Sequence, residues 1–171
     1  LINNNLFRGA YSMAGEIGHV SIDMNGVKSP QGKGGLEQYI GNRRIVERAV
    51  RLMSEGRKSI IKELAEGSAE GITPKLIEQA ARKGDQLALD IFDYVADCLA
   101  AAFASTTYLI QPQAFIVGGG VAQAGKFLFD PLDQHLKERL SPFFAERVVI
   151  KTAELGNDAG MIGSATLVFM E

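Results

Sequence analysis

Cysteine is nearly absent from this sequence. A single residue, Cys98, excludes an internal disulfide and a zinc site built from several cysteines. A chain without disulfides fits a reducing cytoplasm, which is the location we expect. Because Cys98 falls in an apolar helical segment, it is expected to be a small buried side chain and not a nucleophile.

An excess of charge of either sign is also lacking. The 18 basic and 20 acidic side chains leave a formal net charge of -2. This balance gives no electrostatic reason to expect nucleic-acid or anionic-membrane binding through this segment. No apolar run approaches the roughly 20 residues that a membrane-spanning helix needs, so no membrane partner is expected.

The usual signals of a chain start are missing as well. The sequence opens on Leu1-Ile2 and runs at once into Asn3-Asn4-Asn5, without an initiator Met or the apolar core of a signal peptide. We therefore expect residues 1–171 to be a single domain from a longer protein; a processed or tagged terminus is the alternative. Its 171 residues, 46% of them hydrophobic, suffice for one domain with a substantial core.

Turn residues and hydrophobic periodicity divide the first two thirds of the chain into short irregular segments and helices. We expect a hairpin over Leu1–Phe7, a short strand over Val20–Asp23 and no regular structure over Ser29–Gly35. Helices are expected from Leu36 or Asn42 to Ser54, near Ile60–Glu66, from Pro74 (with Thr73 as N-cap) to Lys83-Gly84, and from Asp85 to about Leu109.

The last third of the chain alternates strands and helices. An apolar strand over Ala114–Val117 leads through Gly118-Gly119-Gly120 to a helix over about Lys126–Leu140. A second strand over Val148–Ile150 leads through the segment 156–160 to a last helix, whose expected inner side chains are Met161, Ile162, Ala165, Leu167 and Val168. Fully apolar strands favour a parallel sheet covered on both faces, so the predicted fold class is α/β.

A polar cluster precedes the helices. Glu16 and His19 lie in the glycine-rich stretch Gly15-Glu16-Ile17-Gly18-His19, and Glu37 follows a second glycine-rich loop. Carboxylates and an imidazole can hydrogen-bond neighbouring hydroxyl groups, so a sugar or polyol is the first ligand to consider. The alternatives are a turn histidine satisfied by backbone for His19, and a helix first-turn acid favoured by the helix dipole for Glu37.

Two glycine-rich turns follow the predicted strands. Gly118, Gly119 and Gly120 would let backbone approach a phosphate or a nucleoside closely, although neither a dinucleotide-binding nor a P-loop motif is present. The turn that contains Asn157, Asp158 and Gly160 has the same character. A tight strand-to-helix turn is the alternative for the first, and a helix cap, which Asp158 favours, for the second.

Taken together, these motifs strongly resemble the ROK family of bacterial sugar kinases and sugar-responsive repressors. The resemblance runs from about Leu6 to the end, through Gly15–His19, Leu36-Glu37, Ile116–Gly120 and Leu155–Ala165. It implies the C-terminal domain of an actin-like, hexokinase-type (ribonuclease H-like) ATPase fold. It also implies that Glu16, His19 and Glu37 contact sugar hydroxyls. In kinase members, Gly118, Gly119 and Gly120 would lie by the nucleotide, together with Asn157, Asp158 and Gly160.

The sequence departs from the family pattern at a zinc site. Family members commonly bind zinc through the histidine that matches His19 and three cysteines, whose positions here hold Ser29, Gln31 and Gly35. Neutral side chains and a glycine cannot replace three thiolates, so we expect no structural zinc and no other metal site. His19 is then free to hydrogen-bond a sugar with either nitrogen.

A second departure is the absence of the family's N-terminal domain, with its phosphate loop and catalytic Asp. No catalytic residue is therefore expected within residues 1–171. The expected function is the sugar-binding half of an ATP-dependent, Mg²⁺-requiring hexose kinase of the glucokinase type, inactive alone. The alternative is the sugar-sensing domain of a ROK repressor, and a ligand-free interaction domain is the third. A hexose or amino-hexose, ATP and a second copy in a homodimer are the expected partners.

Overall fold

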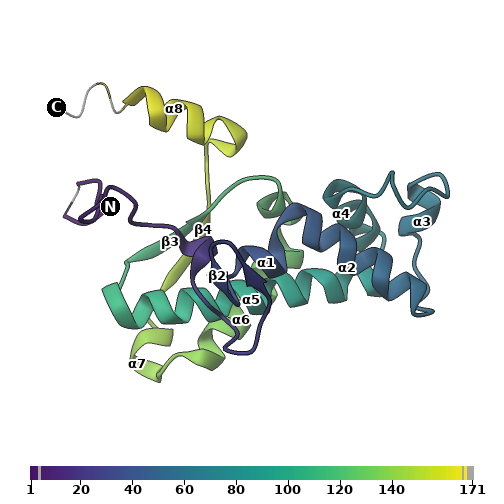
Figure 1. The fold of residues 1–171 in the computed structure, drawn as a ribbon, viewed down its shortest axis with the longest axis horizontal. Coiled ribbons are helices and arrows are strands. Elements are labelled where there is room, and N and C mark those ends of the chain that lie inside the picture. Colours follow the sequence, from purple (N-terminus) through teal and green to yellow (C-terminus); the bar gives the residue numbers. More distant parts are fainter. Residues whose placement is uncertain (4, 167, 169–171) are drawn as a thin grey trace.

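Two long helices form the centre of the molecule, whose computed structural model describes residues 1–3, 5–166 and 168 (Figure 1). Helices α5 (Gln86–Ile110) and α6 (Lys126–Arg139) pack against each other. Asp85 caps α5 by accepting a hydrogen bond from the backbone N–H of Ala88 at 2.9 Å. The helix ends where Gln111 adopts the left-handed conformation, directly before Pro112. The expected long helix is confirmed.

The core lies along this helix pair. Leu87, Ile91 and Val95 of α5 are fully buried, as are three leucines of α6 spaced four residues apart, Leu128, Leu132 and Leu136. Burying a side chain of this size stabilises the fold by about 1.5–3 kcal/mol. Cys98 is buried on α5, as expected. No helix within the described residues combines the length and apolarity needed to cross a bilayer.

A two-stranded parallel sheet joins this helical layer. Strand β3 (Ala114–Val117) pairs with β4 (Val149–Thr152) so that Phe115 lies opposite Ile150. Phe115 points inward and stacks on Phe103 of α5, with 4.1 Å between ring centroids. On the other face, Ile116 is 61% exposed and Val149 is 42% exposed. The expectation that both faces of the sheet are covered is therefore wrong for the described residues. An apolar strand can be buried on both faces, but its sequence does not specify which element covers each face.

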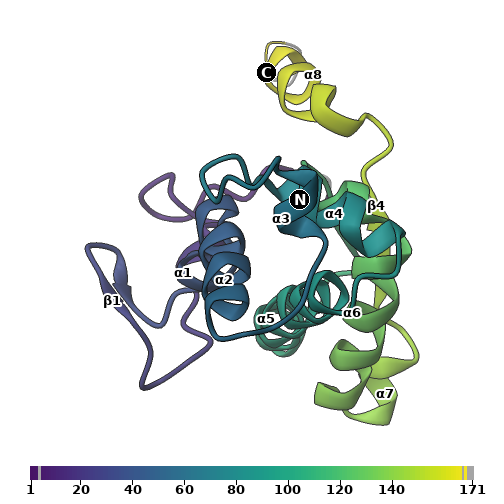
Figure 2. The ribbon, with the colours of Figure 1, turned by 90° about the vertical axis from the view of Figure 1, so that its right-hand side faces the viewer.

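Shorter helices surround the α5–α6 pair. They are α1 (Glu37–Ile40), α2 (Asn42–Ser54), α3 (Ile61–Leu64), α4 (Pro74–Arg82) and α7 (Pro142–Ala145). Helices α1, α2 and α4 contact α5, whereas α3 contacts α4 and α7 contacts α6. Thr73 caps α4, accepting from the Leu76 backbone N–H at 3.3 Å, and Pro74 is the first helical residue, as predicted. In the view of Figure 2, α5 lies between α2 on one side and α6 on the other.

The segment before α1 differs from the sequence-based expectation. The expectation of no regular structure over Ser29–Gly35 is wrong, because β1 (Lys28–Ser29) and β2 (Gly32–Lys33) form a minimal hairpin. The strand expected over Val20–Asp23 is reduced to a single bridge between Ser21 and Gly35, and the hairpin expected over Leu1–Phe7 to one between Ile2 and Asn5. Glycine partners at Gly32 and Gly35 give the pairs near Ser29 and Ser21 few side chains to pack, so pairing there stops after one or two residues.

The chain ends in an exposed helix. After the 3-10 turns η2 (Val121–Ala124) and η3 (Gly156–Asp158), α8 (Ala159–Thr166) stands away from the rest of the molecule in both ribbon views (Figures 1 and 2). Met161 is 70% exposed and Ile162 is 42% exposed, so the inward face expected for this helix is not buried. Leu167, assigned to that face from the sequence, lies outside the described residues.

Candidate functional site

Three of the residues selected from the sequence come together at the surface. His19 ends the 3-10 turn η1 (Ile17–His19), Glu16 precedes that turn, and Glu37 is the first residue of α1. The His19 Nδ1 lies 4.0 Å from Glu16 Oε2, and its Nε2 lies 3.7 Å from Glu37 Oε2. The imidazole is therefore flanked by a carboxylate on each side.

These separations leave hydrogen-bonding capacity free. Both exceed the distance of an ordinary hydrogen bond, so neither carboxylate is fully engaged by the ring. The side chains of Glu16 and Glu37 are 61% and 63% exposed, and that of His19 is 38% exposed. The cluster can thus accept several hydrogen bonds from adjacent hydroxyl groups and donate one from the imidazole.

Backbone packing holds the cluster in place. A Cβ at Gly18 would lie 3.5 Å from the Cβ of Glu37, and one at Gly35 would lie 3.3 Å from the Gly18 carbonyl oxygen. The Leu36 backbone N–H also donates to the Val20 carbonyl at 3.0 Å. The small residues around His19 therefore let the start of α1 approach closely enough for Glu37 to face the imidazole.

Tyr39 fastens the loop between His19 and α1, and sequence reasoning missed it. Its hydroxyl donates to Asp23 Oδ2 at 3.1 Å and accepts from the Val27 backbone N–H at 3.3 Å. Asp23 Oδ1 in turn accepts from the Asn25 backbone N–H at 2.9 Å. Burial raises the pKa of Tyr39. The hydroxyl is therefore protonated at neutral pH and can donate to Asp23. The Asn25-Gly26 turn motif was the sequence signal that could have indicated this contact, because only a glycine at position 26 leaves room for the Tyr39 hydroxyl.

The positions expected to replace zinc ligands offer no ligand set. The Ser29 hydroxyl donates to the Gly32 carbonyl at 3.2 Å and accepts from the Gln31 backbone N–H at 3.2 Å, inside the β1–β2 hairpin. Gly35 supplies no side chain. Among the described residues, no group of three or more His, Cys, Asp or Glu side chains is placed to hold a metal ion. These residues do not fit a thiolate-bound zinc; the absence of zinc from the protein stays a prediction.

The glycine-rich turns meet at the carboxyl ends of β3 and β4. Gly118, Gly119 and Gly156 line a small hollow of about 70 Å³, together with side chains that include Thr152 and Ala153. Gly119 and Gly156 have φ values of 79° and 53°, which favour glycine. Ligands of open α/β sheets bind at such strand ends. The hollow is therefore the natural place for a ligand that contacts backbone.

The other residues of this group are distributed around the hollow. Gly120 directly precedes η2, Asn157 and Asp158 belong to η3, and Gly160 lies in the first turn of α8. A Cβ added at Gly120 or Gly160 would meet no other atom within 4 Å, so close packing does not require glycine at either position.

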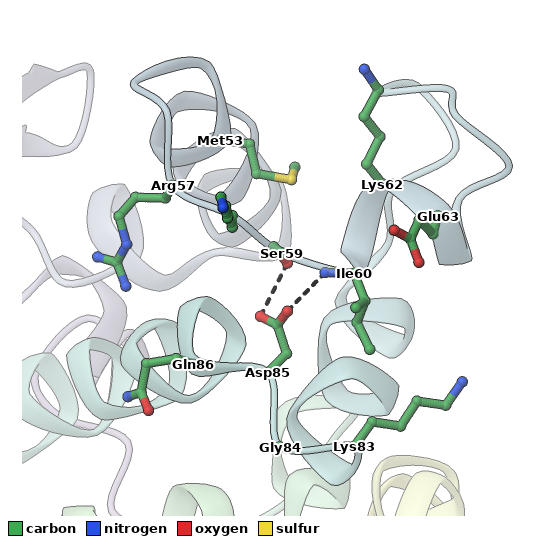
Figure 3. A pocket seen from close by; sticks show the side chains of 11 residues that line it. Met53, Arg57, Ser59, Ile60, Lys62, Glu63, Lys83, Gly84, Asp85 and Gln86 are labelled. Carbon is green, nitrogen blue, oxygen red and sulfur yellow. Dashed lines mark hydrogen bonds between the residues drawn. The ribbon is translucent and has the colours of Figure 1, made fainter.

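A wider hollow of about 660 Å³ lies elsewhere, between the end of α2 and the start of α5 (Figure 3). No residue selected from the sequence lines it. Its central carboxylate, Asp85, accepts from the Ser59 hydroxyl at 3.0 Å and the Ile60 backbone N–H at 2.8 Å, besides capping α5. Asp85 thus holds residues 59–60 against the start of α5 and is not free for chemistry.

Comparison with known proteins identifies relatives of this chain. A family model described as the ROK family matches residues 1–171. A glucokinase of Thermotoga maritima is 34% identical over 167 residues, which are 95% of this chain and 51% of the relative. The N-acetylglucosamine repressor of Escherichia coli O157:H7 is 28% identical over 167 residues, covering 97% of this chain and 39% of the repressor.

A solved structure is similar over nearly the whole chain. The ROK family glucokinase from Streptomyces griseus, in complex with glucose and AMPPNP, superposes with a TM-score of 0.88 at 33% identity and covers 98% of this chain and 55% of its own. The expected α/β class and actin-like, hexokinase-type architecture are thereby confirmed. The chain spans about half the length of the curated glucokinases that it matches.

Proposed function

Because this chain belongs to the ROK family, we propose that it is the sugar-binding half of an ATP-dependent hexose kinase of the glucokinase type. One observation carries the proposal: Glu16 and Glu37 flank His19 from two separate segments, with hydrogen-bonding capacity facing solvent. Relatives at 34% identity that are named glucokinases favour a hexose as the hydroxyl-bearing ligand.

The three side chains have distinct roles in this proposal. The carboxylates of Glu16 and Glu37 accept hydrogen bonds from neighbouring hydroxyls of a hexose or amino-hexose, and His19 donates or accepts between them. Charged acceptors make the stronger hydrogen bonds to neutral donors, so these contacts orient the sugar ring. None of the three is assigned the catalytic base.

The hollow lined by Gly118, Gly119 and Gly156, called here the glycine hollow, is the proposed nucleotide-binding region. Backbone groups of Gly118, Gly119 and Gly120 would approach ATP closely, and the turn with Asn157, Asp158 and Gly160 would border it. Mg²⁺ would arrive with ATP and neutralise charge on its phosphates. A relative solved with an ATP analogue supports this use of ATP.

Residues 1–171 are in this proposal the C-terminal domain of a two-domain cytoplasmic protein that forms a homodimer. The catalytic base and the phosphate loop would come from the other domain. Nucleic acid is not a proposed partner of this segment.

Phosphorylation of hexoses by the full-length protein, with ATP and Mg²⁺, tests the activity. We expect turnover of at least one hexose. In Glu16→Ala and His19→Ala, sugar affinity should fall roughly tenfold or more, because each removes a hydrogen bond to a polar ligand. Glu70→Ala, which removes an exposed carboxylate outside the cluster, is the matched control.

Two results would contradict the proposal. Unaltered sugar affinity in both variants would remove the cluster from the site. No turnover on any hexose, together with sequence-specific DNA binding, would favour the second candidate function, the sugar-sensing domain of a repressor. The similarity to N-acetylglucosamine repressors at 28% identity is what keeps this second candidate open.

A further inference from the structure

A third hollow, of about 350 Å³, lies beside α2 and is separate from both proposed ligand sites. It is lined by Val27, Gln38, Tyr39, Arg44, Glu47, Arg48, Arg51 and Tyr94. Three guanidinium groups and one carboxylate therefore face the same space. This surplus of positive charge contrasts with the net charge of -2 of the whole chain.

Arg48 differs from the other two arginines. Arg44 donates to Glu47 Oε2 at 2.8 Å and to Gln38 Oε1 at 3.0 Å, and Arg51 donates to Glu55 Oε1 at 3.1 Å. Arg48 has no hydrogen-bond or ion-pair partner among the described residues, and its Nε is buried without any partner. That nitrogen is closed to solvent, so a ligand in the hollow would accept hydrogen bonds from the terminal Nη groups of Arg48, which also have no partner among the described residues.

The orientation of Arg48 favours a planar acceptor. Its guanidinium carbon lies 3.4 Å from the centroid of the Tyr94 ring, so one face of the group is covered by the ring. The N–H donors of a guanidinium lie in its plane, so stacking on the ring covers a face of the group and not the edge that carries its two Nη groups. Two parallel N–H groups match two oxygens of a phosphate.

The tyrosines beside Arg48 add no negative charge. Burial raises the pKa of Tyr94 to about 12 and also raises the pKa of Tyr39. Both phenols are neutral at physiological pH. An anion in the hollow would thus meet Glu47 as the only carboxylate of the lining, and that carboxylate is already paired with Arg43 and Arg44.

We propose that this hollow binds an oxyanion of the phosphate type, held by the in-plane edge of Arg48 and the positive charge of Arg44 and Arg51. The ligand is free phosphate or the phosphate group of a small ester, which share this chemistry. The site goes beyond the proposed sugar and nucleotide contacts, because no residue of Glu16, His19, Glu37 or the glycine turns lines the hollow.

Isothermal titration of the full-length protein with inorganic phosphate tests the proposal, in buffers of matched ionic strength and without sugar or nucleotide. We expect a phosphate-binding event whose affinity falls about tenfold or more in Arg48→Gln, since a charge-assisted pair is lost. Arg43→Gln removes the same charge from the same helix, at a side chain that is 85% exposed and outside the lining, and should bind phosphate as the wild type does.

Other outcomes of these titrations would contradict the proposed phosphate site. No phosphate binding by the wild type, or equal affinity in wild type and Arg48→Gln, overturns the proposal. If Arg48→Gln does not fold, Arg48→Lys is the test: it keeps the charge but not the planar pair of donors, so a several-fold loss supports the site and unchanged affinity overturns it. Titration with a hexose phosphate identifies the source, since tighter binding than that of inorganic phosphate points to an ester and weaker binding to the free ion.

Discussion

Cys98 illustrates how burial sets chemistry at the scale of one residue. The thiol is 7% exposed on α5, and its burial raises its pKa, so little thiolate is present near neutral pH. The same apolar surroundings that the helical pattern predicts thus make the side chain unreactive. Reactivity is the measurable consequence.

We expect alkylation of Cys98 by iodoacetamide at pH 8 to be slow in the folded protein and fast after denaturation. Both low accessibility and a low thiolate fraction contribute to the slow rate. A Ser68→Cys, Cys98→Ala double variant, with its thiol on an exposed loop, should react fast in both states. Equal rates for folded and unfolded Cys98 would contradict the assigned burial.

Gly26 is a second residue whose identity is set by its neighbours. A Cβ there would lie 1.9 Å from the Tyr39 hydroxyl oxygen and 2.8 Å from the Gly34 Cα. The hydroxyl could move, but the backbone at Gly34 could not without reshaping the loop.

Gly26→Ala should therefore destabilise the protein by about 1–3 kcal/mol, the usual cost of overpacking. Urea unfolding measures the loss. Gly163→Ala in α8, where an added Cβ meets nothing within 4 Å, is the control and should be neutral or slightly stabilising. A Gly26→Ala protein as stable as the wild type would show that the loop adapts.

At the scale of elements, the loop from Val20 to Gly35 depends on a hydroxyl. Tyr39 on α1 connects the loop at two points, Asp23 and Val27, and lies two residues after Glu37. The helix that carries a proposed sugar contact thus also anchors the loop next to His19. This makes Tyr39 a positioning residue, with no ligand contact of its own required.

Tyr39→Phe should raise the KM for sugar several-fold and leave kcat nearly unchanged, because it loosens the cluster without removing a sugar contact. Its stability should fall by about 1 kcal/mol, the worth of a hydrogen bond. Tyr108→Phe is a matched control, since the Tyr108 hydroxyl accepts from the Ser141 backbone N–H at 2.8 Å near α7. A similar loss of stability in both variants with no change in KM would reduce Tyr39 to a structural role.

On the scale of the whole molecule, two parts of the described chain are left uncovered by other elements. The outer face of the β3–β4 sheet is open at Ile116 and Val149, and α8 packs on no buried core. The proposed sugar contacts and the proposed nucleotide contacts would hold the two substrates, but no catalytic base is assigned among the described residues. Phosphoryl transfer depends on positioning both substrates and on neutralising phosphate charge.

Residues 1–171 expressed alone should therefore phosphorylate no hexose, while the full-length protein does. A coupled assay of ADP release, run at equal concentrations of both proteins, makes this comparison. Circular dichroism is the control that the shorter protein is folded. Hexose-dependent turnover by residues 1–171 at a rate near that of the full-length protein would place the catalytic base within this chain.

Local signals in the sequence were sufficient for most elements. Thr73 as a cap, the apolar stripe of α5 and the run Ala114–Val117 each encode structure within a few residues, and the structure agrees with them. The structure of the glycine-rich segments was predicted less accurately. The β1–β2 hairpin and the single bridge at Ser21 depend on backbone pairing between residues that carry no periodic pattern.

The sequence by itself determined the long helices, the parallel strand pair, the buried Cys98 and the choice of Glu16, His19 and Glu37 as candidates, but not the short helix α7. Only the tertiary structure decided that the two glutamates flank the imidazole, that Tyr39 reaches Asp23 from 16 residues away, and that Arg48 finds no acceptor within the part of the chain that the structure describes. The reason is physical: propensity, capping and periodicity act between neighbours in the chain. Which side chains meet, and which stay unpaired, depends on how distant segments pack.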